Sequence, residues 1–274
     1  MPELPEVELV RRALEPVLAG VRFDRVVLRR KNLRIPFPRR FAQRLTGHSV
    51  TALTRRAKYL LATLSSGETL LIHLGMTGGF RVEHARIGGG YRSEEATDDE
   101  KHDHVVFTMS SGAVVTFNDA RRFGVMDLIG RNQLDTHPVV GRLGPEPLLA
   151  AFDAAALARA CHKKSVPLKV ALLDQHVVAG VGNIYASEAL WLARLSPRRK
   201  ASTIATPTGR PRHSAERLSA AVVEVLDAAI ARNGPRFRVY DREGGPCLRK
   251  GCGGIVRRLV QASRSTFYCP RCQK

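Results

Sequence analysis

The sequence predicts an α+β protein with two lobes. The first is an N-terminal antiparallel β-sandwich with one N-terminal helix, and the second is a C-terminal helical region followed by a small cysteine-rich β-ribbon. Three observations support this fold class. Short strand-forming runs separated by turns fill residues 21–130. Stretches with helical spacing of apolar residues follow His137. Four of the five cysteines fall within the last 28 residues.

The N-terminal helix is predicted over residues 6–19. Val7, Val10 and Leu14 recur at the spacing of one helix face. Gly20 suits the position after the last helical residue, where a left-handed backbone often ends a helix. Pro16 is expected to kink the last turn or tighten it.

Strands are predicted in four runs of the following segment, because each run is rich in apolar residues and is bounded by turn residues. The runs are 59–64, 69–74, 105–109 and 114–117, with Ser-Ser-Gly turns at 65–67 and 110–112. The segment 84–101 is rich in glycine and charge and is expected to form an exposed loop. Together with the first helix, these runs predict a sandwich over residues 1–130.

Helices are predicted in the second lobe at about 151–161, 167–174, 183–194 and 214–232, with a solvated connection at 196–213. The last helix should stop at Asn233-Gly234. The expected domains are therefore a sandwich at 1–130, a helical domain at 131–235 and a ribbon at 236–274.

The charge balance indicates a polyanionic partner. The chain has 44 lysines and arginines against 25 aspartates and glutamates, a net charge of +19. Nucleic acid is the favoured partner, because each basic side chain on a phosphate releases condensed counterions. A ribosomal, chromatin-like or membrane-surface protein is the alternative. The acidic N-terminal segment does not look like a targeting signal, and no apolar run is long enough to span a membrane. We expect a cytoplasmic, nucleoid-associated monomer.

The clustered cysteines form two short pairs, Cys247-x4-Cys252 and Cys269-x2-Cys272. Four thiolates on two tight turns suit one tetrahedral zinc ion with no open position for water, so the zinc should be structural. An iron–sulfur site or unligated thiols are the alternatives. Cys161 stands apart and is expected to be a small packed residue.

The N-terminus offers unusual chemistry. The run Met1-Pro2-Glu3 could simply be a helix start with acids near its positive end. If Met1 is removed, however, Pro2 exposes a secondary amine with a pKa nearer neutrality than that of lysine. Such an amine can attack a sugar C1′ carbon and expel the base, and the resulting iminium favours elimination of the 3′ phosphate. Glu3 is positioned in sequence to supply acid–base catalysis.

Several motifs are spread over nearly the whole chain. They are PELPE (2–6), RAKY (56–59), HLGMTG (73–78), KHDH (101–104), DARRFG (119–124), GPEPL (144–148), AGVGNIYA (179–186) and SRSTFY (263–268). In this order they resemble the formamidopyrimidine-DNA glycosylase family, which is structurally related to endonuclease VIII. The resemblance implies a helix-two-turn-helix hairpin, a zinc ribbon, and double-stranded DNA with oxidised bases or abasic sites in the cleft between the lobes.

The resemblance also implies catalytic roles. Pro2 would be the Schiff-base nucleophile and Glu3 the general acid. Lys58 would donate a proton in β-elimination, and Arg264 would serve δ-elimination. Glu6 would help to position the sugar.

Further residues are implied to bind DNA. Phosphates flanking the lesion would be held by Lys58, His73, Asn183 and Arg264, with Lys169 nearby, and further DNA contacts would come from His102, Arg121 and Lys164. Met76, Arg121 and Phe123 would fill the gap left by an everted nucleotide. Taken singly, large apolar residues such as Met76 and Phe123 are more often core residues. Asn183 would also serve as an ordinary helix cap.

The chain departs from the family pattern in three places. Ala120 replaces a frequent proline, and the first cysteine pair spans four residues rather than two. The junction 233–240 is shorter than in members that excise 8-oxoguanine, which carry a Gly- and Tyr-containing segment over the everted base. Either the junction is naturally this short, or a mobile loop belongs there that the printed sequence does not include.

Three functions follow from these patterns. The first is a bifunctional glycosylase and AP lyase that removes oxidised purines, namely formamidopyrimidines and 8-oxoguanine, and nicks the strand by β,δ-elimination. The second is the same chemistry with a preference for oxidised pyrimidines, as in endonuclease VIII. The third is a non-catalytic DNA-binding protein with a zinc ribbon, which leaves Pro2 and Glu3 without a role.

Overall fold

The computed structural model describes residues 1–82, 85–88 and 99–274. The chain forms two compact units, Met1–Arg142 and Leu143–Lys274, and each is described by itself. Most of the loop predicted at 84–101 lies outside the described residues. At both ends of that segment the prediction is wrong, because Ala85–Gly88 forms strand β6 and Glu100–His102 forms a short 3-10 helix.

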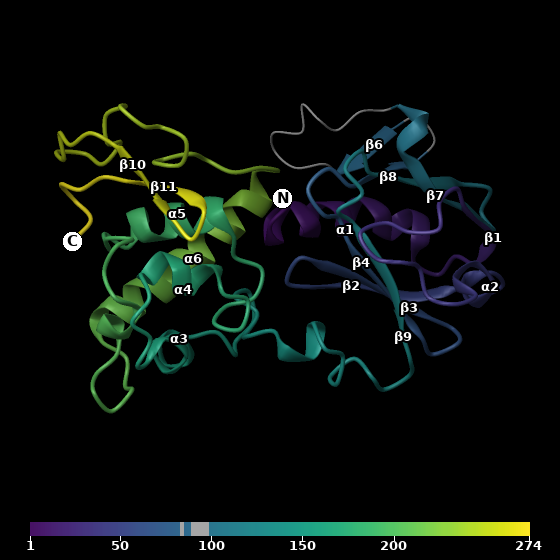
Figure 1. Cartoon of the computed structure of the whole chain (residues 1–274), viewed down its shortest axis with the longest axis horizontal. Helices are drawn as coiled ribbons and strands as arrows, with labels where there is room; N and C mark the ends of the chain where they lie inside the picture. Colours follow the sequence, from purple (N-terminus) through teal and green to yellow (C-terminus); the bar gives the residue numbers. More distant parts are fainter. Residues whose placement is uncertain (83–84, 89–98) are drawn as a thin grey trace. The chain divides into compact units, whose positions relative to one another are not determined.

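The first unit is an antiparallel β-sandwich, as predicted (Figure 1). Its strands form two sheets. The larger sheet has the order β1 (Phe23–Leu28), β7 (Asp103–Met109), β8 (Val114–Asn118), β5 (Gly79–Val82) and β6, and the smaller has β2 (Val50–Arg56), β3 (Tyr59–Leu64), β4 (Thr69–His73) and β9 (Val125–Ile129). A short helix, α2 (Phe41–Leu45), packs near β1.

The sandwich core explains which strands were predictable. The larger sheet contributes aromatic pairs, with Phe23 5.4 Å from Phe107 and Phe80 5.3 Å from Phe117 between ring centres. Strands β3, β4, β7 and β8 are mostly buried and lie where the apolar runs predict them. The strands that the pattern misses include β1, whose Asp24 and Arg25 are exposed. Exposed charged faces conceal the strand signal.

Helix α1 (Leu4–Leu18) begins two residues earlier than predicted, because Pro5 is tolerated in the first turn. The helix continues through Pro16 to Leu18. Its buried face packs against β2 and β3 of the smaller sheet and against β6 of the larger one. Helix α1 therefore contacts both sheets of the first unit, and the amino-terminal residues lead directly into it (Figure 1).

The second unit is helical, with a two-stranded ribbon at its C-terminal end. Its elements are α3 (Ala154–Cys161), α4 (Leu168–Leu173), α5 (Asn183–Leu192), the 3-10 helix Ala201–Ile204, α6 (His213–Ala231), β10 (Arg257–Gln261) and β11 (Arg264–Tyr268). Helix α3 starts later than predicted because the Asp153 side chain caps it, accepting from the Ala156 N–H at 2.6 Å. Cys161 is fully buried, and burial raises the pKa of its thiol to about 11, as expected for a packed residue.

The turn between α4 and α5 is held by one side chain. The Gln175 amide donates to the carbonyls of Leu173 and Val181, and its oxygen accepts from the Gly180 N–H at 2.9 Å. Gly180 has a left-handed backbone with φ of 83°. This turn fixes the start of α5 at Asn183. Within the described residues, we find no helix with the length and apolarity required to cross a membrane.

Candidate DNA-binding and catalytic site

The first turn of α1 holds the amino-terminal residues in place. Pro2 is buried, and Glu3 is only 3% exposed. The Glu6 carboxylate accepts a hydrogen bond from the Glu3 N–H at 2.8 Å, which satisfies one donor at the open end of the helix. The helix itself therefore fixes the backbone of this segment, and the Glu3 side chain is buried.

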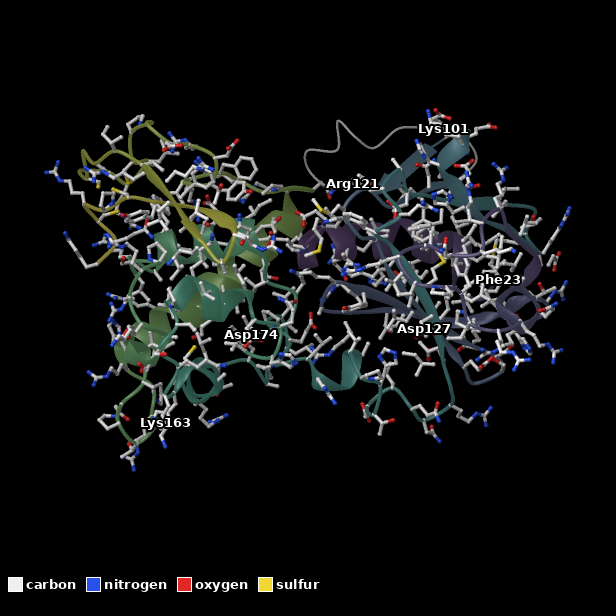
Figure 2. The ribbon with its side chains drawn as sticks, viewed as in Figure 1. Phe23, Lys101, Arg121, Asp127, Lys163 and Asp174 are labelled. Carbon is white, nitrogen blue, oxygen red and sulfur yellow. The ribbon has the colours of Figure 1, made fainter. Side chains whose placement is uncertain are left out.

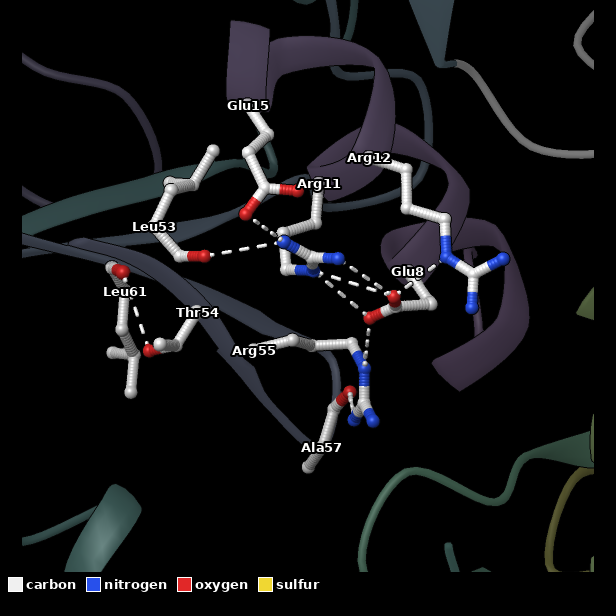
Figure 3. A network of polar contacts seen from close by, with 9 residues as sticks. All are labelled: Glu8, Arg11, Arg12, Glu15, Leu53, Thr54, Arg55, Ala57 and Leu61. Atoms are coloured by element: carbon white, nitrogen blue, oxygen red, sulfur yellow. Dashed lines mark hydrogen bonds and ion pairs between the residues drawn. The ribbon is translucent and has the colours of Figure 1, made fainter. Parts of the chain in front are cut away.

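A half-buried carboxylate, Glu8, connects α1 to the end of β2 and the turn that follows it (Figure 3). It accepts from Arg11 and Arg12 on its own helix and from Arg55 Nε at 3.2 Å. Arg55 in turn donates to the Ala57 carbonyl at 3.0 Å. Burial by itself would raise the pKa of Glu8, but these hydrogen bonds and the arginine charges hold that pKa below its usual value. The carboxylate thus stays charged and fixes the β2–β3 turn against the helix.

This turn presents Lys58. Strand β2 pairs with β3 up to Arg56 and Tyr59, so Ala57 and Lys58 form the tip of the hairpin. Ala57 has a left-handed backbone with φ of 52°, which costs a non-glycine residue on the order of 1 kcal/mol. Lys58 is 5% exposed. A strained turn and a buried lysine are features that often occur at functional sites.

His73, at the end of β4, lies near several positive charges. Burial, Lys58, Arg34 and the amino terminus of the chain together lower the pKa of His73 to about 4. The Gly75 N–H donates to His73 Nδ1 at 3.1 Å, so in the neutral ring the proton lies on Nε2. His73 is therefore a neutral donor in the same neighbourhood as Lys58 and the amino terminus.

Three residues are predicted to fill the gap left by an everted nucleotide, and they lie on two loops that are joined through Asp119. Met76 is 39% exposed and Phe123 is 41% exposed, which is unusual for apolar residues of their size. Arg121 lies on the loop after β8, with its guanidinium carbon 4.6 Å from the centre of the Phe123 ring (Figure 2). The Arg121 N–H donates to Thr77 Oγ1 at 3.2 Å.

Asp119 is fully buried and fixes both loops. It accepts hydrogen bonds from Thr77 Oγ1 and from the Gly124 N–H. At Gly75, with φ of 67°, a Cβ atom would lie 2.4 Å from the Phe123 carbonyl carbon, so only glycine fits this approach. The two loops therefore pack back to back and hold Met76, Arg121 and Phe123 together. The backbone carbonyl of His102 joins this arrangement by accepting from the Asp119 N–H at 3.0 Å.

In the second unit, a fully buried lysine links α4, α5 and β11. Lys169 Nζ donates to Asn183 Oδ1 at 2.6 Å, to Thr266 Oγ1 at 2.8 Å and to the Ser265 carbonyl at 3.0 Å. The Asn183 amide donates to the same Ser265 carbonyl at 3.0 Å. Arg264 precedes Ser265 and is exposed. The structure thus brings Lys169, Asn183 and the start of β11 together.

Arg264 is presented by a tight turn. Gln261 pairs with Arg264, so Ala262 and Ser263 form a two-residue turn with φ of 46° and 59°. Lys164 does not join this group: it lies after α3, and its Nζ is 3.5 Å from the carboxylate of Asp174, the residue after α4.

The four clustered cysteines have the geometry of a zinc site. Their Sγ atoms all lie within 4.8 Å of one another, with 3.8 Å between Cys247 and Cys272 and 3.6 Å between Cys252 and Cys269. Sulfurs around a tetrahedral zinc ion are separated by about 3.8 Å. A Cβ atom at Gly254 would lie 2.6 Å from the Cys269 sulfur, so the loop leaves this space to the thiolates.

Comparisons with known proteins agree with this geometry. Three family models match in order: the formamidopyrimidine-DNA glycosylase N-terminal domain over residues 1–126, the H2TH domain of that enzyme over 143–241, and the zinc finger found in FPG and IleRS over 244–274. A formamidopyrimidine-DNA glycosylase of Rhodopseudomonas palustris (strain BisA53) is 54% identical over 295 aligned positions, covering all of both chains. The chain belongs to the formamidopyrimidine-DNA glycosylase family.

Solved structures of the family have the same fold. The MutM (Fpg) protein of Thermus thermophilus matches with a TM-score of 0.82 and 37% identity, covering 99% of this chain and 98% of that one. A complex of the Lactococcus lactis Fpg with DNA containing an abasic site matches with a TM-score of 0.84 and 29% identity, covering 99% of both.

Membership in this family settles the class of function. The chain is a DNA glycosylase of base excision repair, and AP lyase activity is typical of its family. Its partner is DNA, and its four clustered cysteines form a structural zinc site. The hypothesis of a non-catalytic DNA-binding protein is therefore wrong.

Several residues that organise the site were not predicted from the sequence. Asp119 is a buried carboxylate and Glu8 is a half-buried one, and both fix loops. Glu188 on α5 accepts the N–H groups of Arg238, Val239 and Tyr240 at 2.9–3.0 Å. The one available signal was the place of Asp119, an acid directly after an apolar strand. Glu8 and Glu188 look like ordinary helix-surface acids, because the partners through which they fix loops, Arg55 and the backbone of 238–240, are distant in sequence.

Proposed function

We propose that the chain removes oxidised purines, formamidopyrimidines foremost, through the amine of Pro2 after removal of Met1. The observation that supports this proposal most strongly is the shared neighbourhood of the amino terminus, Lys58 and His73, next to a sheltered Glu3. Neighbouring positive charges disfavour protonation of this amine, so they favour its neutral form. An amine of this kind is nucleophilic near neutral pH.

In the first step the Pro2 nitrogen bonds to C1′ of the damaged nucleotide. The bond from C1′ to the base breaks, and the base leaves with the electron pair and a proton from the Glu3 carboxyl group. The nitrogen loses its own proton as the sugar ring opens, and the product is an iminium. Glu6 is proposed to orient the sugar through its place on the first turn of α1.

Elimination follows from the electron demand of the iminium. Removal of a C2′ proton breaks the bond between C3′ and O3′, and O3′ leaves with the 3′ phosphate. Removal of the C4′ proton then breaks the bond between C5′ and O5′, and O5′ leaves with the 5′ phosphate. We assign the proton donor of the first elimination to Lys58, and we assign Arg264 to the second.

The remaining residues are proposed to hold DNA. Phosphates flanking the lesion would contact Lys58, His73 Nε2, Asn183 and Arg264, and further contacts would come from His102, Arg121 and Lys164. Because Lys169 is fully buried, its proposed role is to orient Asn183. Met76, Arg121 and Phe123 would occupy the gap left by the everted nucleotide. We further propose that the protein acts as a monomer at the nucleoid in the cytoplasm, where its substrate is found.

A second candidate, oxidised pyrimidines, is favoured by the short junction after α6. Helix α6 ends at Ala231, and Glu188 already holds the backbone from Arg238 onward. Residues 232–237 are all that connects these two points. The alignment with the R. palustris relative extends over 295 positions, whereas this chain has 274 residues, so the relative contains residues that have no counterpart in this chain. So short a junction leaves no chain to fold over an everted 8-oxoguanine.

One experiment tests both candidates. Sodium borohydride reduces an iminium to a stable amine, so it traps the enzyme on its DNA substrate. Duplexes with an abasic site, a formamidopyrimidine, 8-oxoguanine or thymine glycol are treated with wild-type protein. We expect trapping on the abasic and formamidopyrimidine duplexes, with 8-oxoguanine the slower of the two purines. If thymine glycol is trapped faster than formamidopyrimidine, the second candidate is correct. If no duplex is trapped, the amine mechanism is wrong.

A further inference from the structure

The only tryptophan of the chain, Trp191, lies against the cysteine cluster. It belongs to the last turn of α5 and is 7% exposed. Its apolar neighbours include Val239 and Val256, which pack in the same small core as Cys247. Helix α5, whose first residue is Asn183, thus contacts the zinc site at its other end.

The indole ring makes a specific polar contact there. Trp191 Nε1 donates a hydrogen bond to Cys247 Sγ at 3.3 Å, and both groups are buried. A buried indole N–H needs an acceptor, and here the acceptor is a metal-binding sulfur. A phenylalanine ring could provide the aromatic packing at this position, so packing alone does not explain why the side chain has an N–H donor.

Two arginines add positive charge at the same place. The Arg249 guanidinium carbon lies 4.4 Å from the centre of the Trp191 ring, and Arg249 also donates to the Trp191 carbonyl. The guanidinium carbon of Arg238 lies 5.6 Å from the ring. Four thiolates around one zinc ion leave a net charge of −2, so donors and cations beside the sulfurs stabilise the loaded site.

We propose that Trp191 supports the zinc site through its hydrogen bond to Cys247. The bond withdraws charge from this thiolate, which makes the sulfur less nucleophilic and slows its loss from the metal. Trp191 is thus a positioning residue, because it acts on the ribbon through Cys247 and touches no substrate. Glu188, one turn earlier on α5, fixes the backbone that leads into the ribbon.

Zinc release tests this proposal directly. Trp191→Phe keeps the aromatic ring and removes the N–H donor. We expect zinc loss to a colorimetric chelator, in the presence of a thiol-alkylating reagent, to be about tenfold faster than in wild type. Mass spectrometry should find Cys247 alkylated first. The matched control is Ser187→Ala, which removes a buried donor from the same helix that bonds to the Asn183 carbonyl rather than to a cysteine. Wild-type rates and an unchanged order of alkylation in Trp191→Phe would overturn the proposal.

A second measurement needs no variant and is decisive if Trp191→Phe does not fold. Wild-type protein with ¹⁵N-labelled tryptophan gives one indole signal, and ¹¹³Cd can replace the zinc. We expect a scalar coupling between the indole proton and the cadmium nucleus, transmitted through the N–H···S bond. A fully cadmium-loaded protein that shows no such coupling would contradict the proposal.

Discussion

Two hairpins of this molecule each carry one cation to which we assign a catalytic role, but the hairpins are held in place by different means. Lys58 lies at the tip of β2–β3 after the left-handed Ala57, and Arg264 follows the left-handed pair Ala262 and Ser263 at the tip of β10–β11. The first hairpin belongs to a sandwich with a large apolar core, to which Glu8 and Arg55 add a half-buried ion pair. The ribbon has a much smaller core, and three of its seven buried members are metal-binding cysteines.

A strained turn can thus be supported either by packing or by a metal. Left-handed residues other than glycine cost on the order of 1 kcal/mol each, so both hairpins need support from their surroundings. In the sandwich, that support comes from apolar burial distributed over many residues. In the ribbon, most of it must come from zinc, because metal binding to a four-cysteine site contributes roughly 10 kcal/mol or more.

Zinc removal should therefore separate the two hairpins, and this is the largest effect we expect. After chelation, or in a Cys252→Ser variant, residues 257–268 should lose their protection from amide hydrogen exchange. Residues 50–64 should keep theirs, because no cysteine supports them. Affinity for an abasic duplex should fall about 100-fold, since Arg264 and Asn183 depend on the ribbon. A ribbon that stays protected after its zinc is shown to be gone would remove the distinction between the hairpins.

The ion network of the sandwich hairpin should have a smaller effect. Glu8→Gln leaves Arg55 and Arg11 without their half-buried carboxylate, and we expect a loss of about 2 kcal/mol in the free energy of unfolding, because hydrogen bonds to a charged group are lost. Urea denaturation measures this loss. Glu15→Gln is the matched control, because Glu15 pairs with Arg11 on the surface of the same helix and should matter by less than about 1 kcal/mol. Equal effects of the two changes would show that the network does not support the hairpin.

His73 on β4 pairs with Tyr59 beside the same hairpin, and it should make stability depend on pH. The pKa of His73 is about 4 in the folded protein, against 6.5 for an ordinary histidine. Below pH 6.5 the unfolded chain therefore binds a proton that the folded protein does not, and stability falls as the pH decreases toward 4. Relative to His73→Gln, wild type should lose about 2 kcal/mol between pH 7 and pH 4.5. Parallel pH curves for the two proteins would show that His73 is not held neutral.

The sequence was sufficient for those parts of the fold that have a local pattern. Apolar runs predicted β3, β4, β7 and β8, helical spacing predicted α1 and α6, and the cysteine pairs predicted the zinc site. Other features depend on partners far apart in the chain. Nothing near Lys169 in sequence indicates that Asn183, Ser265 and Thr266 satisfy its ammonium group in a buried position.

The same reason explains what sequence reasoning missed at the zinc site. Trp191 is separated from Cys247 by α6 and by the whole junction, so no spacing rule connects them. Strand β1 carries charged residues on exposed positions, and in β2 two consecutive residues, Thr51 and Ala52, are exposed, so neither strand shows the strict alternation that reveals a strand. Contacts between residues far apart in the chain, and strands with one exposed face, are therefore the features that local sequence patterns do not predict.

Mapping the trapped covalent complex tests the mechanism most directly. Wild-type protein is reduced with borohydride on abasic DNA and digested, and the residue that carries the sugar remnant is identified by mass spectrometry. We predict that the remnant is on the nitrogen of Pro2 in chains that have lost Met1, and that Pro2→Gly lowers base excision on the order of 10³-fold or more. A remnant on Lys58, or full activity in protein that retains Met1, would contradict the proposed role of the proline amine.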